Sequence, residues 1–177
     1  MPKEIDNHVP RKDFINAMRS VASPVTVVTT DGPYGRYGAT VSAFSSVSAD
    51  PPTVLVCLNA ESRIASAVKE NGQFCVNVLS NKAKEIANRF AGLHDRWIDD
   101  RFSGIDCFGS HGMSPIIDGG PNFLCAVTLI VKSGTHLIVT GQVQSISGDC
   151  DCPLIWRDGD YHTAVRERCS GSSVAEA

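Results

Sequence analysis

Short apolar runs separated by turn-forming residues recur along most of the chain. They are rich in β-branched and aromatic side chains, and in several of them apolar and polar residues alternate, which is typical of strands. We expect strands at 25–30, 36–40, 53–58, 74–79, 123–131 and 136–146. Lys132–Thr135 is expected to form a hairpin turn. Leu154–Trp156 and Tyr161–Val165 predict a final hairpin that turns at Asp158-Gly159.

Three other stretches carry the spacing of helices. The first follows Pro10 and predicts an amphipathic helix packed on the sheet through Phe14, Ile15, Met18 and Val21. Ser62 is placed to cap a second helix, which Asn71-Gly72 should end. Ser80 is placed to cap a third helix. Its inward face is expected to carry Ile86, Ala87 and Phe90.

The strands do not alternate regularly with helices, so a β-α-β fold is not indicated. The expected fold is mainly β with flanking helices, built as an antiparallel barrel. A chain of 177 residues is large enough for one domain with a substantial core, which we place at 10–165. The ends at 1–9 and 166–177 are polar or small and are expected to be flexible. Residues 92–121 form a long irregular segment, as functional loops often do.

The composition narrows the function classes. Sixteen Lys and Arg residues against nineteen Asp and Glu residues give a net charge of −3 without a basic patch, so no nucleic-acid partner is expected. No apolar run approaches the length of a membrane span, and the N-terminus lacks a secretory signal, so we expect a cytoplasmic protein. Seven cysteines are an odd number, which argues against a disulfide framework. Cys150 and Cys152 lack further ligands at the right spacing, so no metal site is expected.

The stretch Gly38–Pro52 differs from ordinary core or loop sequence. It carries no charge before Asp50, is rich in Ser, Thr, Gly and Ala, and is followed by the most apolar run of the chain. Small side chains beside a buried strand let a flat ligand lie against the backbone, where hydroxyl and N–H groups can bond its rim. An isoalloxazine ring has these requirements. A Ser-rich turn between two strands is the alternative interpretation.

A second polar group follows the apolar run. Asn59, Ser62 and Arg63 lie where a strand ends and a helix is expected to begin, and the free N–H groups of a helix start favour an anion. A flavin phosphate is a candidate ligand, and simple capping is the alternative. Asn77 is a polar residue in an apolar run. Its amide requires partners, which either a neighbouring strand or a ligand could supply.

The pattern G-x-T-V-S-A-F-S-S-V-S-x-D-P-P from Gly38, followed by an apolar strand and Asn59-Ala60-Glu61-Ser62, resembles the flavin-binding signature of the short-chain NAD(P)H:flavin oxidoreductases. Weaker matches follow in the family's order at 74–80, 134–136, 141–143 and from 153 on. The resemblance implies a split β-barrel of the FMN-binding type with Greek-key connections. It also implies a homodimer with the flavin near the subunit interface.

The implied activity is hydride transfer from NADH or NADPH to FMN or FAD, with the reduced flavin passed to a separate monooxygenase. The implied flavin contacts are Thr40, Val41, Ser42 and Ala43 at the ring, Ser45 and Ser46 beside it, Asn59, Ser62 and Arg63 at the phosphate or ribityl chain, and Asn77 nearby. His136 is expected at the nicotinamide side of the flavin as the catalytic residue. The family usually has Asp before this His, so Thr135 is a departure.

Other functions stay open at this point. A flavin-binding electron carrier would bind flavin tightly and consume no NADH, and the altered Gly-Thr-His element is compatible with it. A reductase of a non-flavin acceptor, such as a corrinoid, would keep its flavin. A β-barrel binding domain without flavin would ignore added FMN and FAD. The sequence does not separate FMN from FAD or NADH from NADPH.

Overall fold

The computed structural model describes residues 8–149 and 152–165. The helices of this part are α1 (Arg11–Arg19), α2 (Arg63–Asn71) and α3 (Lys84–Phe90). Its strands are β1 (Ser23–Pro24), β2 (Thr26–Thr30), β3 (Tyr37–Val41), β4 (Phe44–Ala49), β5 (Pro52–Asn59), β6 (Gln73–Val78), β7 (Cys107–Phe108), β8 (Ile116–Ile117), β9 (Asn122–Ser133), β10 (His136–Ser147), β11 (Leu154–Arg157) and β12 (Asp160–Thr163). The expectation of a mainly β fold with flanking helices is confirmed.

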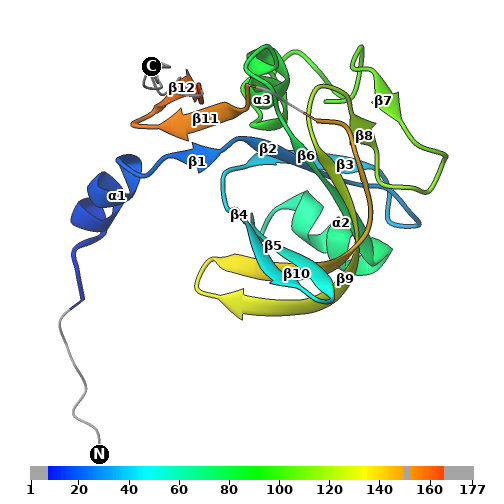
Figure 1. Ribbon diagram of the computed structural model, residues 1–177, viewed down its shortest axis with the longest axis horizontal. Helices are drawn as coiled ribbons and strands as arrows, with labels where there is room; N and C mark the ends of the chain where they lie inside the picture. The colour runs from blue at the N-terminus through cyan, green and yellow to red at the C-terminus, as the bar shows by residue number, and fades with distance from the viewer. Residues whose placement is uncertain (1–7, 150–151, 166–177) are drawn as a thin grey trace, which may run out of the picture.

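Seven antiparallel strands form the main sheet in the order β3-β2-β6-β9-β10-β5-β4. Its two edge strands, β3 and β4, follow each other in the chain, so the sheet curls toward itself (Figure 1). The curl is not completed by strand pairing within the described residues, in keeping with a split barrel. Register shifts in β10 help the long strands to bend, and one lies at Gly141, where a Cβ would meet the Phe74 ring at 2.6 Å.

Helix α2 fills the inside of the curl (Figure 1). Its buried face consists of Ile64, Ala65, Ala67 and Val68, which belong to the main core or border it. The Ser62 hydroxyl accepts a hydrogen bond from the N–H of Ala65 at 3.3 Å, as expected of a cap. Gly72 ends the helix with a φ of 69°, a left-handed conformation that glycine adopts without strain. Both predicted ends of this helix are therefore confirmed.

A second layer lies beside the barrel. It contains α3 and the small sheet β1-β11-β12, and its core includes Val27, Leu79, Ala87, Phe90 and Leu154. The expected cap of α3 at Ser80 is wrong, because this helix begins at Lys84. Ser80 instead forms a β-bridge with Pro153, which holds its backbone in an extended conformation.

Helix α1 forms as predicted, but it does not pack on the sheet. None of its residues is buried, and Phe14 and Met18 are 59% and 48% exposed. The helix is attached through its end, where the N–H of Asp158 donates to the carbonyl of Arg19 at 2.7 Å. Its apolar face therefore has no cover within the described part of the chain.

The two predicted flexible ends fall mostly outside the described residues. Of 1–9 the structure describes only His8 and Val9, and it describes none of 166–177. Cys150 also lies outside, so the Cys150–Cys152 pair has no structural account. No helix of the described ranges is long and apolar enough to cross a membrane.

Candidate active site

The Ser-rich stretch forms the end of one edge strand and the whole of the other. Thr40 and Val41 are half-buried at the end of β3, and Ser42 and Ala43 are exposed between the edges. Ser45 lies on β4 and is exposed, as is its neighbour Ser46. The alternative of a simple Ser-rich turn is therefore wrong, because β4 pairs with β5 along this stretch.

The backbone at the link between β3 and β4 offers two free donors. The carbonyl of Ser42 accepts from the N–H of Phe44 at 3.2 Å, and that of Ala43 accepts from the N–H of Cys57 at 3.1 Å. The N–H groups of Ser42 and Ala43 donate to no other residue in the described part of the chain. Two unpaired N–H groups on exposed residues with small side chains suit the acceptor-rich rim of a flavin ring.

The hydroxyl of Thr40 is engaged within the protein. It donates to the carbonyl of Ala87 at 2.7 Å and so ties β3 to α3. A ligand at this position would therefore meet the Thr40 backbone, because the side chain is already engaged.

His136 and Asn59 are brought together by strand pairing. They are register partners at adjoining ends of β10 and β5, and both are exposed. The hydroxyl Oγ1 of Thr135 lies 2.9 Å from Nδ1 of His136, and the carbonyl of Thr135 accepts from the N–H of Ala60 at 3.0 Å. The residue that replaces the usual Asp therefore still supplies a polar partner to the imidazole.

Asn59 is also joined to the start of α2. Its side-chain oxygen accepts from the N–H of Glu61 at 2.9 Å, and its carbonyl accepts from the Ser62 hydroxyl at 2.6 Å. These bonds hold the loop between β5 and α2. Asn59, Ser62, Arg63 and His136 thus form one polar cluster at the same end of β5.

Ser62 and Arg63 line a cavity of about 570 Å³ between β3, the start of α2 and residues 95–102. Two other arginines of this cavity are paired: Arg36 with Asp100 at 2.8 Å, and Arg101 with Asp95 at 2.6 Å. The hydrogen bond from Arg101 lowers the pKa of the Asp95 carboxyl. Arg63 has no ion pair within the described ranges, so its charge is available to an anion at the helix start.

Asn77 does not lie with the other predicted site residues. It is 1% exposed, and its amide nitrogen donates to the carbonyl of Val27 at 2.9 Å and to the hydroxyl of Thr29 at 3.1 Å. Its side-chain oxygen accepts from the N–H of Ile117 at 2.8 Å. Neighbouring segments supply every partner the amide needs, so we leave Asn77 out of the proposed flavin contacts.

Two aromatic residues that the sequence did not predict as site residues, Trp156 and Tyr161, lie beside the ring-binding stretch. They border a cleft of about 180 Å³ lined by Val25, Thr40, Val41, Ser42, Ala91, Trp156 and Tyr161. The cleft joins the ring-binding stretch to the final hairpin, β11 and β12. Tertiary contacts bring these segments together, among them the pairing of β1 with β11 and the bond from the Tyr161 hydroxyl to Asn88 of α3.

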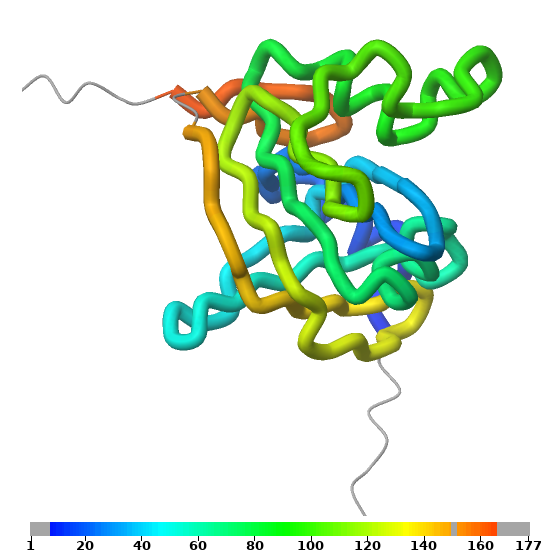
Figure 2. The backbone as a smooth tube through the Cα atoms, turned by 90° about the vertical axis from the view of Figure 1, so that its right-hand side faces the viewer, coloured from blue at the N-terminus to red at the C-terminus, as the bar shows by residue number. Residues whose placement is uncertain are grey.

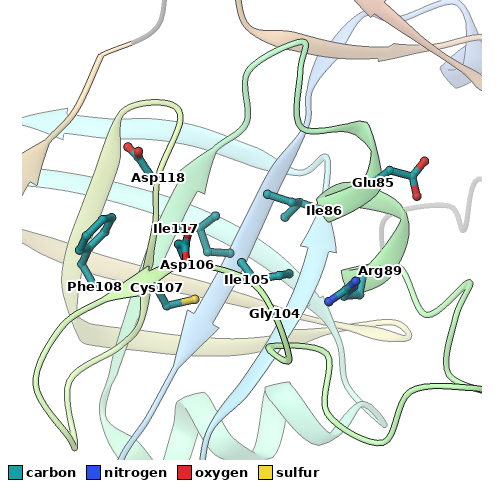
Figure 3. A pocket seen from close by; sticks show the side chains of 10 residues that line it. All are labelled: Glu85, Ile86, Arg89, Gly104, Ile105, Asp106, Cys107, Phe108, Ile117 and Asp118. Atoms are coloured by element: carbon teal, nitrogen blue, oxygen red, sulfur yellow. The ribbon is translucent and has the colours of Figure 1, made fainter.

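A larger cavity, of about 890 Å³, lies between α3 and the loop that carries β7 (Figure 3). Charged side chains such as Glu85 and Asp118 sit around apolar ones such as Ile86 and Ile105. None of the predicted site residues lines it. Its size alone therefore does not make it the candidate active site.

Comparison with known proteins agrees with the geometry. The family model of the flavin reductase like domain matches residues 18–164. A protein of Pantoea ananatis named FMN reductase (NADH) RutF is 36% identical over 161 residues, which cover 90% of this chain and 84% of that protein. The protein of the same name from Escherichia coli K12 is 34% identical over 167 residues, which cover 92% of this chain and 99% of that protein.

Solved structures show the same relationship. Nitrilotriacetate monooxygenase component B from Mycobacterium thermoresistibile has a TM-score of 0.80 at 30% identity, over 94% of this chain and 95% of that chain. The flavin reductase PheA2 has a TM-score of 0.79 at 30% identity, over 89% of this chain and 100% of that chain. The chain belongs to the family of flavin reductase-like domains.

Proposed function

We propose that this chain transfers a hydride from NADH to FMN and releases the reduced flavin. The observation that carries the proposal is the pair of free N–H groups at Ser42 and Ala43, set among small side chains at the exposed edge of the sheet. The relatives named FMN reductase (NADH) support both substrates. FAD and NADPH are the other candidates, and a flavin reductase solved with NADP+ has this fold.

The residues of the chain have separate roles in this proposal. The N–H groups of Ser42 and Ala43 bond the pyrimidine rim, and Ser45 and Ser46 flank it without adding charge. Arg63 and the start of α2 hold the phosphate, next to Asn59 and Ser62. When bound, the flavin supplies the hydride acceptor. The protein has to hold the nicotinamide near it and keep both rings in place.

His136 is proposed to contact the nicotinamide side of the site. The Thr135 hydroxyl fixes one ring nitrogen, Nδ1, at 2.9 Å, which leaves Nε2 free to donate to the carboxamide of the nucleotide or to stabilise negative charge on the reduced ring. Hydride transfer needs no protein acid. His136 would therefore position the nucleotide or stabilise the negative charge of the reduced flavin, without donating a proton.

A separate enzyme is proposed to receive the reduced flavin. Solved neighbours include component B of nitrilotriacetate monooxygenase and BorF, the flavin reductase component of a two-component tryptophan halogenase. A reductase of such a pair has to let the flavin leave. The exposure of Ser42, Ala43, Asn59 and Arg63 suits that requirement. A cytoplasmic location, where NADH is available, is part of the same proposal.

A homodimer is proposed from the apolar surface of the single chain. The apolar face of α1 is exposed to solvent in the described part of the chain, and Leu129 on β9 and Ile146 on β10 are 57% and 62% exposed. The hairpin of β4 and β5 also projects from the body of the molecule (Figure 2), and it carries Val47, which is 54% exposed. A second copy of the chain could cover these residues.

The test of the function is steady-state oxidation of NADH, with FMN and NADH each varied in turn, for the native protein and for His136→Ala. We expect turnover that saturates with FMN, and a loss of about tenfold to a hundredfold in kcat/KM for NADH in the variant. His111→Ala, which removes an exposed histidine of the 109–113 loop, is the matched control and should keep full activity. Firmly bound flavin with no consumption of NADH would instead favour the electron-carrier function.

A further inference from the structure

We infer that Trp156 forms an aromatic wall of the flavin cleft and contacts the isoalloxazine ring directly. This assignment rests on the proposed function, because it takes the backbone at Thr40–Ser42 as the ring-binding edge. It adds a binding residue from the final hairpin, a part of the chain to which the flavin contacts expected from the sequence do not extend.

The indole of Trp156 lines the same cleft as Thr40, Val41 and Ser42, which belong to the proposed ring-binding edge. Apolar Val25 and Ala91 complete the lining with Tyr161, so the cleft has few polar groups besides the backbone of the ring-binding edge. A planar ring bonded at Ser42 would have this aromatic pair as its nearest apolar cover.

Neighbouring strands and a second aromatic ring hold the indole of Trp156 in place. Trp156 pairs with Ser23 of β1 on one side and with Tyr161 of β12 on the other. The rings of Trp156 and Tyr161 meet edge to face, with centroids 5.0 Å apart and planes at 68°. The hydroxyl of Tyr161 donates to the side-chain oxygen of Asn88 at 3.0 Å, which anchors the hairpin to α3. A fixed ring loses little freedom when a ligand stacks on it.

Part of this fixed ring is exposed to solvent. Trp156 is 38% exposed although the residue two positions earlier, Leu154, is fully buried in the core. The hairpin is therefore firmly seated, and yet it presents part of a large apolar ring to the cleft. Aromatic rings stack well on planar ligands, and the contact adds to the area that is buried. The flavin ring is the planar ligand that the backbone at Thr40–Ser42 is proposed to bind.

The test is an FMN titration that reads the fluorescence of the flavin itself. An indole in contact with an excited flavin donates an electron to it and quenches its emission, an effect that needs near contact. Trp156→Phe keeps an aromatic ring and the packing against Tyr161 but is a weaker electron donor. Trp97→Phe is the matched control, because Trp97 is the only other tryptophan of the chain and is 76% exposed on a distant stretch of sequence.

We expect native protein and Trp97→Phe to quench FMN on binding, and Trp156→Phe to leave the bound flavin markedly brighter. Trp156→Ala should weaken FMN binding by roughly threefold to tenfold, the value of one aromatic contact. The assignment is wrong if Trp156→Phe quenches bound FMN as strongly as native protein and Trp156→Ala leaves the Kd of FMN unchanged. This conclusion would hold even if the protein reduces FMN. If native protein does not bind FMN at all, the proposed function itself is wrong.

Discussion

Asn59 and Asn77 carry the same amide in opposite environments. Asn59 is exposed at the end of β5, and half of its hydrogen-bonding capacity stays available to a ligand. Asn77 is buried among three partners from β2 and β8. Burial therefore decides which of the two amides serves the fold and which can serve the flavin.

Substitution of the two amides should separate these roles. Asn77→Ala leaves buried N–H and carbonyl groups without partners, so we expect it to lower the free energy of unfolding by about 2–3 kcal/mol. Asn59→Ala should cost less than about 1 kcal/mol and mainly weaken FMN binding. Urea unfolding and an FMN titration measure both. Equal stability of the two variants would contradict the assignment.

The charge of Arg63 should act on the phosphate only. We expect Arg63→Ala to weaken FMN binding about tenfold and to leave riboflavin binding unchanged, because riboflavin has no phosphate. Lys69→Ala removes a positive charge from the other end of α2 and is the control. A similar loss for FMN and riboflavin would place the arginine at the ring or the ribityl chain instead.

Two core thiols should resist modification in the folded state. Burial raises the pKa of Cys75 and of Cys125 from 9.0 to about 12, so both stay protonated at pH 8.5. We expect iodoacetamide to modify them only after unfolding, as read by mass spectrometry of each site. Their labelling in native protein at the rate seen in urea would contradict the burial.

The same thiols predict how stability changes with pH. The unfolded chain releases these protons near pH 9.0, whereas the folded chain keeps them until about pH 12. Their contribution is therefore complete below pH 9.0 and falls as the pH rises toward 12. A lower midpoint of urea unfolding at pH 10.5 than at pH 8 is the expected result. Cys75→Ala with Cys125→Ala should reduce this pH dependence.

At the scale of elements, local sequence predicted most strands and helices. The N-cap of α2 at Ser62 and its C-terminal end at Gly72 were predicted from the local residues, and both predictions are confirmed. The start of α3 was not, because Ser80 pairs with Pro153, a residue far along the chain. Local sequence also did not show that Phe44–Ala49 is an edge strand, since its Ser-rich composition resembles a turn. Errors arose where a distant partner decided the conformation.

Helix α1 gives a prediction at this scale. Its spacing correctly indicated an apolar face, but none of the residues of that face is buried. If a second copy covers it, Phe14→Glu should weaken the dimer by burying a charge in the interface. Sedimentation would then show more monomer, while Lys12→Glu, a polar residue of the same helix, should change little. An unchanged dimer in Phe14→Glu would remove α1 from the proposed interface.

At the scale of the molecule, the candidate site combines segments that are far apart in the sequence. The link at 42–43 bonds to β5 through the N–H of Cys57, Asn59 at the end of β5 pairs with His136 of β10, and Trp156 of β11 lines a cleft with Ser42. The resemblance to flavin reductases identified the first three segments. The resemblance also extends over Trp156, but only the structure shows that its ring lines the same cleft as Ser42.

In the proposed function, flavin acts as a substrate: it binds, is reduced and dissociates. The most direct test of this claim is an anaerobic stopped-flow experiment in which NADH meets the protein with FMN in large excess over protein chains. Loss of flavin absorbance at 450 nm reports reduction. We predict that nearly all the FMN is bleached, over many turnovers of each chain. Bleaching that stops at one flavin per chain, or no bleaching, would contradict the claim.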